Sequence, residues 1–176
     1  MALEKGSSRW ELLLRIIFGS VWIIDGSLKF VTMAPGDVVT LVQMAGTGQP
    51  AWLSGWYSFW SGAVSANPTG FLYGVGALEL LLGFAVLLGL LRKPAYILGV
   101  ILALLIYAID EGFGGPYVFS SSSGIGSTDI GAAIIYTFVF LALWIIDSYL
   151  PTHYSLDHVI ARKVKWWSKV GFEDRP

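Results

Sequence analysis

The sequence predicts an all-α integral membrane protein, a four-helix bundle whose N and C termini both lie in the cytoplasm. Three observations support this prediction. Of the 176 residues, 55% are hydrophobic and 13% are charged, whereas an average soluble domain contains roughly 25% charged residues. Four apolar stretches are long enough to cross a hydrocarbon core, which takes about 20 residues. Outside these stretches, Lys and Arg are confined to alternate connections.

The four predicted spans form one transmembrane domain, residues 1–150. They lie at 10–31, 70–91, 94–110 and 129–150. The third span is short, so we expect Asp110 and Glu111 at its end to lie near the membrane surface. Residues 151–176 then form a cytoplasmic tail, in which we expect a short amphipathic helix that lies on the membrane as an anchor.

Basic residues set the orientation, because short loops rich in Lys and Arg stay in the cytoplasm. Those outside the spans are Lys5, Arg9, Arg92, Lys93, Arg162, Lys163, Lys165, Lys169 and Arg175. The two remaining connections, 32–69 and 111–128, contain no Lys or Arg. This asymmetry predicts a multi-pass protein of the cell membrane with both termini and the turn at 92–93 inside.

The long connection after the first span predicts two short helices at the outer interface. Pro35 and Asp37 open the first of them, and the Gly- and Pro-containing segment 46–50 ends it. The second is uncharged and places aromatic residues at helical spacing. These residues are Trp52, Trp56, Phe59 and Trp60. They predict either an aromatic belt at the headgroups or the walls of an entrance for a quinone or a lipid.

The composition excludes several kinds of chemistry. Without cysteine the chain has no disulfide, iron–sulfur cluster or redox thiol. His153 and His158 both follow the last span, so we expect no imidazole in the membrane to hold a haem or copper, and no bound metal. Redox chemistry would therefore need an organic cofactor. A net charge of -1 gives no basic excess for nucleic acid.

Several ionisable side chains fall within the predicted spans, where each costs at least about 2.5 kcal/mol on insertion scales. They include Arg15, Asp25, Lys29, Glu79 and Asp110. Glu79 lies roughly 14 Å below the outer end of its span, close to the midplane. Its expected partner is Lys29 above it or Arg15 below it, unless the carboxyl is protonated. These groups predict a proton or substrate pathway, or else ion pairs that only fix the helix register.

Small residues predict which faces of the first two spans meet. On the first span, Arg15, Gly19, Trp22, Gly26 and Lys29 follow one another at steps of four and three, which places them on one face of a helix. The small residues of the second span are Gly76, Gly83 and Ala85. Because small residues let two helices approach closely, we expect this stripe to face the bundle.

The second outer connection, 111–129, is rich in Gly, Pro and Ser, and it predicts either an active-site lid or a flexible connector. Ser127 or Thr128 is the predicted N-cap of the fourth span. The first N–H groups of that helix would then offer an anion site at the outer surface. The carboxylate of Asp129, in the first turn, already offsets part of their positive partial charge.

These residues also resemble a known family. The likeness rests on Arg15, Gly19, Gly26, Lys29, Glu79 and the runs EGFGGPY and GSTDIGAAIIYTFVFLAL. The sequence resembles the DoxD and DoxX group of four-helix membrane proteins along nearly its whole length, and DoxD more closely. The resemblance implies the membrane subunit of a thiosulfate:quinone oxidoreductase, as in sulfur-oxidising archaea and bacteria. Thiosulfate would be oxidised to tetrathionate outside, electrons would pass to a membrane quinone, and a small DoxA-like subunit would be the partner.

The candidate site follows from the charges and from this resemblance. The catalytic candidates, which handle protons or compensate charge, are Asp25, Lys29, Glu79 and Asp110. The candidates for thiosulfate binding are Lys29, Ser127 and Thr128, and those for the quinone are Arg15, Trp22, Trp56 and Trp60. One alternative function is a non-catalytic accessory subunit beside a terminal oxidase or another respiratory complex. Another is a small transporter or proton channel, although the sequence contains no clear inverted repeat or broken helix pair.

Overall fold

The computed structural model describes residues 2–115, 130–149, 154–164, 166 and 167. The described chain is helical, with no strand. Its elements in order are α1 (Ala2–Val31), α2 (Pro35–Gly46), η1 (Ala51–Leu53), α3 (Ser54–Ala66), α4 (Pro68–Leu88), α5 (Arg92–Ile109), η2 (Gly112–Gly114), α6 (Ala132–Tyr149) and α7 (Leu156–Ala161). The predicted all-α class is confirmed.

Three of these helices, α4, α5 and α6, are each long and apolar enough to cross a membrane. The fourth candidate span is α1, which qualifies together with α2 as a pair bent by 115°. These helices indicate a membrane protein, with three, or up to four, candidate spans among the described residues. Three of the predicted starts differ by two or three residues, since α4 begins at Pro68, α5 at Arg92 and α6 at Ala132, whereas α1 begins at Ala2, eight residues before the predicted start of the first span.

Local sequence signals explain where α2 and α4 begin and end. The side chain of Asn67 accepts a hydrogen bond from the Gly70 N–H at 2.9 Å, and Pro68 is the first residue of α4. Gly89 ends that helix at φ 65°, the left-handed conformation that glycine adopts without strain. At α2, Asp37 Oδ2 accepts from the Ala34 N–H at 2.7 Å.

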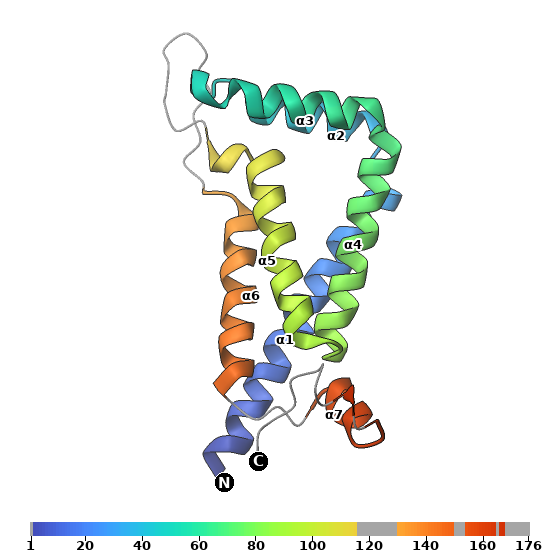
Figure 1. Ribbon diagram of the computed structural model, residues 1–176, viewed down its shortest axis with the longest axis vertical. Helices are drawn as coiled ribbons and strands as arrows, with labels where there is room; N and C mark the ends of the chain where they lie inside the picture. The colour runs from blue at the N-terminus through green and yellow to red at the C-terminus, as the bar shows by residue number, and fades with distance from the viewer. Residues whose placement is uncertain (1, 116–129, 150–153, 165, 168–176) are drawn as a thin grey trace.

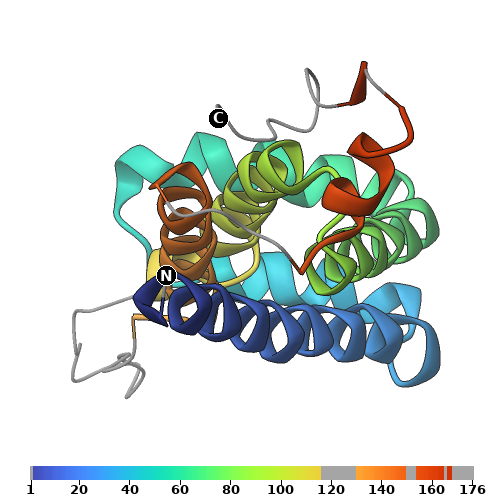
Figure 2. The same cartoon turned by 90° about the horizontal axis from the view of Figure 1, so that it is seen from below.

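The long helices form two closely packed pairs, α1 with α4 and α5 with α6 (Figure 1). The helices α2 and α3 lie across the end of the molecule that is furthest from the N terminus, and we call this the outer end. The start of α1, the turn between α4 and α5, and α7 lie at the opposite end, which we call the inner end (Figures 1 and 2). Described basic residues other than Lys29 therefore gather at the inner end.

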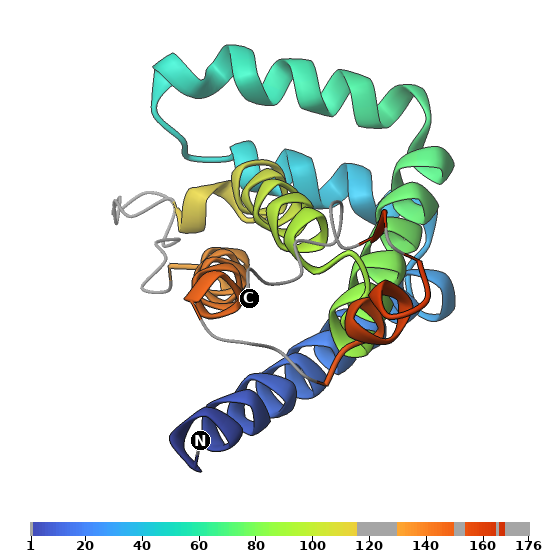
Figure 3. The ribbon, with the colours of Figure 1, turned by 60° about the horizontal axis from the view of Figure 1, so that its bottom comes forward.

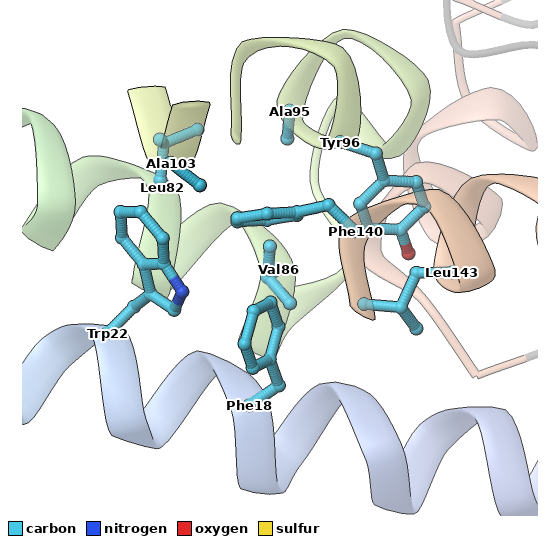
Figure 4. Packing of buried hydrophobic residues seen from close by; sticks show 9 residues of the cluster. All are labelled: Phe18, Trp22, Leu82, Val86, Ala95, Tyr96, Ala103, Phe140 and Leu143. Atoms are coloured by element: carbon cyan, nitrogen blue, oxygen red, sulfur yellow. The ribbon is translucent and has the colours of Figure 1, made fainter. Parts of the chain in front are cut away.

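The two pairs are joined by one hydrophobic cluster to which all four long helices contribute (Figure 4). Its buried members are Phe18, Trp22, Leu82, Val86, Ala95, Tyr96, Ala103, Phe140 and Leu143. The rings of Phe18 and Trp22 on α1 pack edge-on against Phe140 on α6, with centroids 4.8 and 5.2 Å away. Such aromatic contacts stabilise beyond the area that they bury.

Glycine allows α1 and α4 to pack closely. A Cβ at Gly83 would lie 2.9 Å from the Ile23 nitrogen and 3.0 Å from the Gly19 carbonyl oxygen, and one at Gly26 would lie 2.9 Å from the Gly76 carbonyl oxygen. Real Cβ atoms essentially never lie less than 3.0 Å from such atoms, and a distance of 3.0 Å is already unusually tight. The predicted small-residue stripe on the first two spans is therefore confirmed at these glycines.

We expect Gly83→Ala to destabilise the protein by about 1–3 kcal/mol, because the added methyl group must push the two helices apart. Thermal unfolding in detergent measures this change. Gly74→Ala is the matched control on the same helix, since nothing lies within 4 Å of a Cβ at that position. It should be neutral or slightly stabilising. Equal losses from both variants would show that close packing at Gly83 is not what matters.

The two helices predicted for the first outer connection are confirmed as α2 and α3. They pack on each other and are fastened to the outer end of α5. Trp56 Nε1 and the Tyr57 hydroxyl both donate to the Ala108 carbonyl, at 3.1 and 3.2 Å, and Gln49 Nε2 donates to the Gly112 carbonyl at 2.8 Å. The Ala108 carbonyl lies in the last turn of α5, where the helix itself offers no N–H partner.

Candidate functional site

Two groups of ionisable side chains lie toward the outer and the inner end of the molecule, separated by the hydrophobic cluster of Figure 4. The outer cluster comprises Asp25, Lys29, Glu79 and Asp110. The inner cluster comprises Glu11, Arg15, Arg92, Tyr96, Asp147 and Asp157. The first contains all the predicted catalytic residues, whereas most of the second was not anticipated from the sequence.

A buried ion pair forms the centre of the outer cluster. Lys29 Nζ lies 2.7 Å from Glu79 Oε2 and 3.7 Å from Asp25 Oδ2. The side chain of Glu79 is completely buried, that of Lys29 is 16% exposed, and that of Asp25 is 45% exposed. Gly26, whose Cβ would lie 3.1 Å from Glu79 Cβ, lets α4 approach closely enough for this contact. Burial thus increases from Asp25 through Lys29 to Glu79.

The other two long helices complete the outer cluster. Asp110 follows the last residue of α5, and its carboxyl lies close enough to Lys29 for their charges to interact. Tyr136 on α6 lies within the electrostatic range of Asp25, Lys29 and Glu79. Lys29 is therefore paired with carboxylates of α1 and α4, and the charge of Asp110 and the hydroxyl of Tyr136 lie within electrostatic range of it. Such a group can hold an anion or a carbonyl at the lysine and exchange protons at the acids.

The partner of Glu79 is Lys29, one of the two residues predicted for it, and the pairing with Arg15 is wrong. Arg15 Nε instead lies 3.1 Å from Glu11 Oε1, and the same guanidinium donates to the Tyr154 carbonyl. Arg15 and Lys29 are separated by roughly 21 Å along α1. Close packing of Gly26 against α4 brings the outer part of α1, not Arg15, to Glu79.

Arg92 is the main residue of the inner cluster that sequence reasoning missed. It was predicted to lie in a cytoplasmic turn, yet it is the first residue of α5 and only 2% exposed. Its guanidinium pairs with Asp147 of α6 and lies 3.5 Å from Asp157 Oδ2. The signal was Asp147, a carboxylate inside a predicted span, which must find a partner.

The tail reaches the same cluster through Asp157, which is fully buried. Its carboxylate accepts hydrogen bonds from the N–H groups of Leu91 and Arg92 at 2.8 and 3.0 Å, and from Trp167 Nε1 at 3.1 Å. Ser155 caps α7 by accepting from the His158 N–H at 3.2 Å. The predicted tail helix is therefore present, but it is only six residues long. Its acidic residue, Asp157, faces the turn between α4 and α5.

The residues predicted to contact a quinone do not form one site. Arg15 belongs to the inner cluster, and Trp22 is 2% exposed within the hydrophobic cluster of Figure 4. Trp56 and Trp60 lie in α3 at the outer end, where their rings pack on each other at 5.7 Å. Trp22 is therefore a packing residue, and the structure separates it from the two tryptophans of α3.

The predicted anion site at the start of the fourth span is already occupied by a carboxylate. The N–H groups of Ala132 and Ala133, at the start of α6, donate to Glu111 at 3.2 and 3.0 Å. Ser127 and Thr128 lie outside the described residues, and α6 begins too late for either to be its N-cap. Glu111 thus takes the role that was expected of a residue next to the helix.

We expect Glu111→Ala to expose the first N–H groups of α6 and to lower stability by about 1 kcal/mol, as the loss of other helix caps does. Hydrogen exchange at the start of α6 should become faster, because the amides of Ala132 and Ala133 lose their acceptor. Glu111→Gln keeps an acceptor oxygen and is the control. Unchanged exchange in the alanine variant would mean that other groups satisfy these amides.

Comparison with family models, with curated proteins and with solved structures found no match to this chain. The fold and the site therefore define its class: a helical membrane protein with a buried ion pair between a lysine in the last turn of α1 and a carboxylate in the middle of α4. Within the described residues, no group of three or more His, Asp or Glu side chains is placed to hold a metal ion. The expected absence of a metal stays a prediction.

Proposed function

We propose that this chain is the membrane subunit of a thiosulfate:quinone oxidoreductase of the cell membrane, with four spans and both termini in the cytoplasm. In this reaction two thiosulfate ions lose one electron each and join as tetrathionate. The quinone gains these two electrons and takes up two protons to become the quinol. The proposal rests on the DoxD resemblance and on one structural observation, the buried contact of Lys29 with Glu79 in the outer cluster.

This contact suits a site that handles both an anion and protons. Lys29 is the only basic residue near the outer end among the described residues, so it is the group that would attract a dianion there. The graded burial of Asp25, Lys29 and Glu79 provides a path from the surface to the interior. The carboxyl groups of Asp25, Glu79 and Asp110 would supply the quinone with protons.

The expected quinone also fits the chemistry of these groups. A ring carbonyl needs a hydrogen-bond donor, and Lys29 or a protonated Asp110 offers one. Tyr136 provides a further hydroxyl on α6, within electrostatic range of the same cluster. When bound, the quinone would accept the electrons, while this chain would orient its carbonyls and deliver protons.

The charge distribution supports the proposed orientation. The described basic residues at the inner end include Arg9, Arg15, Arg92, Lys93, Arg162 and Lys163. Positive segments stay in the cytoplasm, so the outer cluster would open to the outside, where thiosulfate is oxidised in the DoxD reaction.

The test is thiosulfate-dependent reduction of a water-soluble quinone analogue by the purified protein, alone and with its co-purifying partners, at several acidic pH values. Activity of the isolated chain would support a complete site within these helices. Activity only with a small partner would support the DoxA-like subunit. The proposal is wrong if neither preparation reduces the quinone while a known thiosulfate:quinone oxidoreductase does so under the same conditions.

A second candidate, a non-catalytic accessory subunit of a respiratory complex, is favoured by the outer helices. Trp52 and Phe59 are 79% and 64% exposed, and Met44 is 66% exposed. These side chains suit either the membrane interface or a neighbouring subunit. Purification in mild detergent would separate the two functions, because an accessory subunit should leave the membrane together with large haem-bearing subunits of a terminal oxidase.

A further inference from the structure

An apolar groove runs between α4 and α5 on the exposed side of the helix pairs. Its volume is about 460 Å³, within the roughly 300–1,000 Å³ of small-molecule sites. Its walls include Leu78 and Leu81 of α4 and Leu98 and Leu105 of α5. Leu81 and Leu98 are 67% and 56% exposed. Because every lining residue is apolar, the groove suits a hydrocarbon chain.

Along the helices, the groove is about as long as one leaflet of a bilayer is thick. It begins beside the turn between α4 and α5, where Leu91 and Pro94 line it, and it ends at Leu78 and Leu105. The stretch from Pro94 to Leu105 is roughly 16 Å long at the helical rise. A hydrocarbon core is about 30 Å thick, so one leaflet contributes about 15 Å. The groove therefore matches a single acyl chain that enters from the inner end.

Positive charge lies at the inner mouth of this groove. Lys93, the second residue of α5, directly precedes the lining residue Pro94. Beneath α4 and α5 lies α7 (Figures 2 and 3), which the contacts of Asp157 fasten to the turn. The chain then continues into Arg162 and Lys163, which are both exposed. Basic residues at the membrane surface attract anionic headgroups.

We propose that the groove between α4 and α5 binds one anionic phospholipid of the leaflet at the inner end. One acyl chain lies against Leu81 and Leu98, and the phosphate is held by Lys93, Arg162 and Lys163. The negative charge distinguishes this lipid from a neutral quinone and from a zwitterionic lipid. The site is separate from the outer cluster, so it stands whether or not the oxidoreductase proposal is correct.

The test compares the melting temperature of the full chain in a neutral detergent with added phosphatidylglycerol or phosphatidylcholine of identical acyl chains. A lipid that binds only the folded protein stabilises it, and near saturation we expect phosphatidylglycerol to raise the melting temperature by about 5 °C. Phosphatidylcholine should have little effect. The triple variant K93Q/R162Q/K163Q should lose the increase, whereas Arg9→Gln, which removes an exposed charge on α1, should keep it.

A second pair of variants tests the groove itself. Leu98→Trp fills it and should also abolish the response to phosphatidylglycerol. Ile135→Trp, on the exposed face of α6, adds the same side chain elsewhere and should not. Each variant is compared with its own melting temperature without lipid, which reports whether it is folded. Equal stabilisation by both lipids, or a full response in Leu98→Trp, would overturn the proposal. So would displacement of phosphatidylglycerol by a prenyl-tailed quinone, since the occupant would then be the quinone tail.

Discussion

Replacing Asp157 with alanine is expected to lower the free energy of unfolding by about 3–5 kcal/mol, the range for removing one partner of a buried ion pair. The carboxylate is fully buried and accepts hydrogen bonds from the N–H groups of Leu91 and Arg92. It also holds Leu91 at φ 48°, a left-handed conformation that costs a branched side chain energy. Its loss therefore affects the turn, the Arg92 guanidinium and the tail together.

Thermal unfolding in detergent would measure this loss. Asp157→Asn keeps an acceptor oxygen and should lose less. Asp37→Ala is the control at a surface position, where a carboxylate accepts one N–H at the start of α2, and it should cost only about 1 kcal/mol. If Asp157→Ala were as mild as Asp37→Ala, the tail would be a surface anchor, as the sequence predicted, and not a structural part of the inner end.

The apolar runs and the spacing of the small residues were enough to predict the helices and one contact between them. A run of about 20 apolar residues has few stable forms other than a spanning helix. Steps of four and three between Gly19, Trp22 and Gly26 define a helix face, whatever the neighbouring helix is. The close approach of α1 to α4 could therefore be predicted from α1 and α4 alone.

The partner of each charge could not be predicted in the same way. Whether Glu79 meets Lys29 or Arg15 depends on how far one helix is shifted along the other, and spacing within a single helix does not fix this shift. Arg92 was misplaced because charge usually indicates the surface, whereas Asp147 and Asp157 make its burial possible. Asp157 itself comes from the tail, far away in the sequence.

The aromatic and capping residues show the same limit. The sequence does not distinguish a tryptophan that stacks on a quinone ring from one that packs in the core. The ring of Phe140 against Trp22 identifies Trp22 as part of the core. A cap for α6 was sought next to that helix, where Ser127 and Thr128 have suitable side chains. The structure instead uses Glu111, across the connection from α5.

Exchanging Lys29 and Glu79 together for apolar side chains should separate a structural from a catalytic role of this pair. Lys29→Met alone leaves a buried carboxylate without its partner and is expected to cost about 3–5 kcal/mol of stability, or to force Glu79 to be protonated. The double variant Lys29→Met with Glu79→Leu removes both charges. Its stability should return close to that of the original protein, because apolar replacements of buried pairs are often neutral or stabilising.

Activity should behave in the opposite way. If the pair attracts thiosulfate and delivers protons, the double variant should reduce quinone at least about 100-fold more slowly, the usual loss of a general acid or base, despite its recovered stability. Arg9→Met, which removes an exposed cation from the same helix, should keep normal activity. A stable double variant with a normal rate would reduce the pair to a contact that fixes the register of α1 on α4. Stability and rate must therefore be measured on the same preparations, since only their divergence assigns chemistry to the outer cluster.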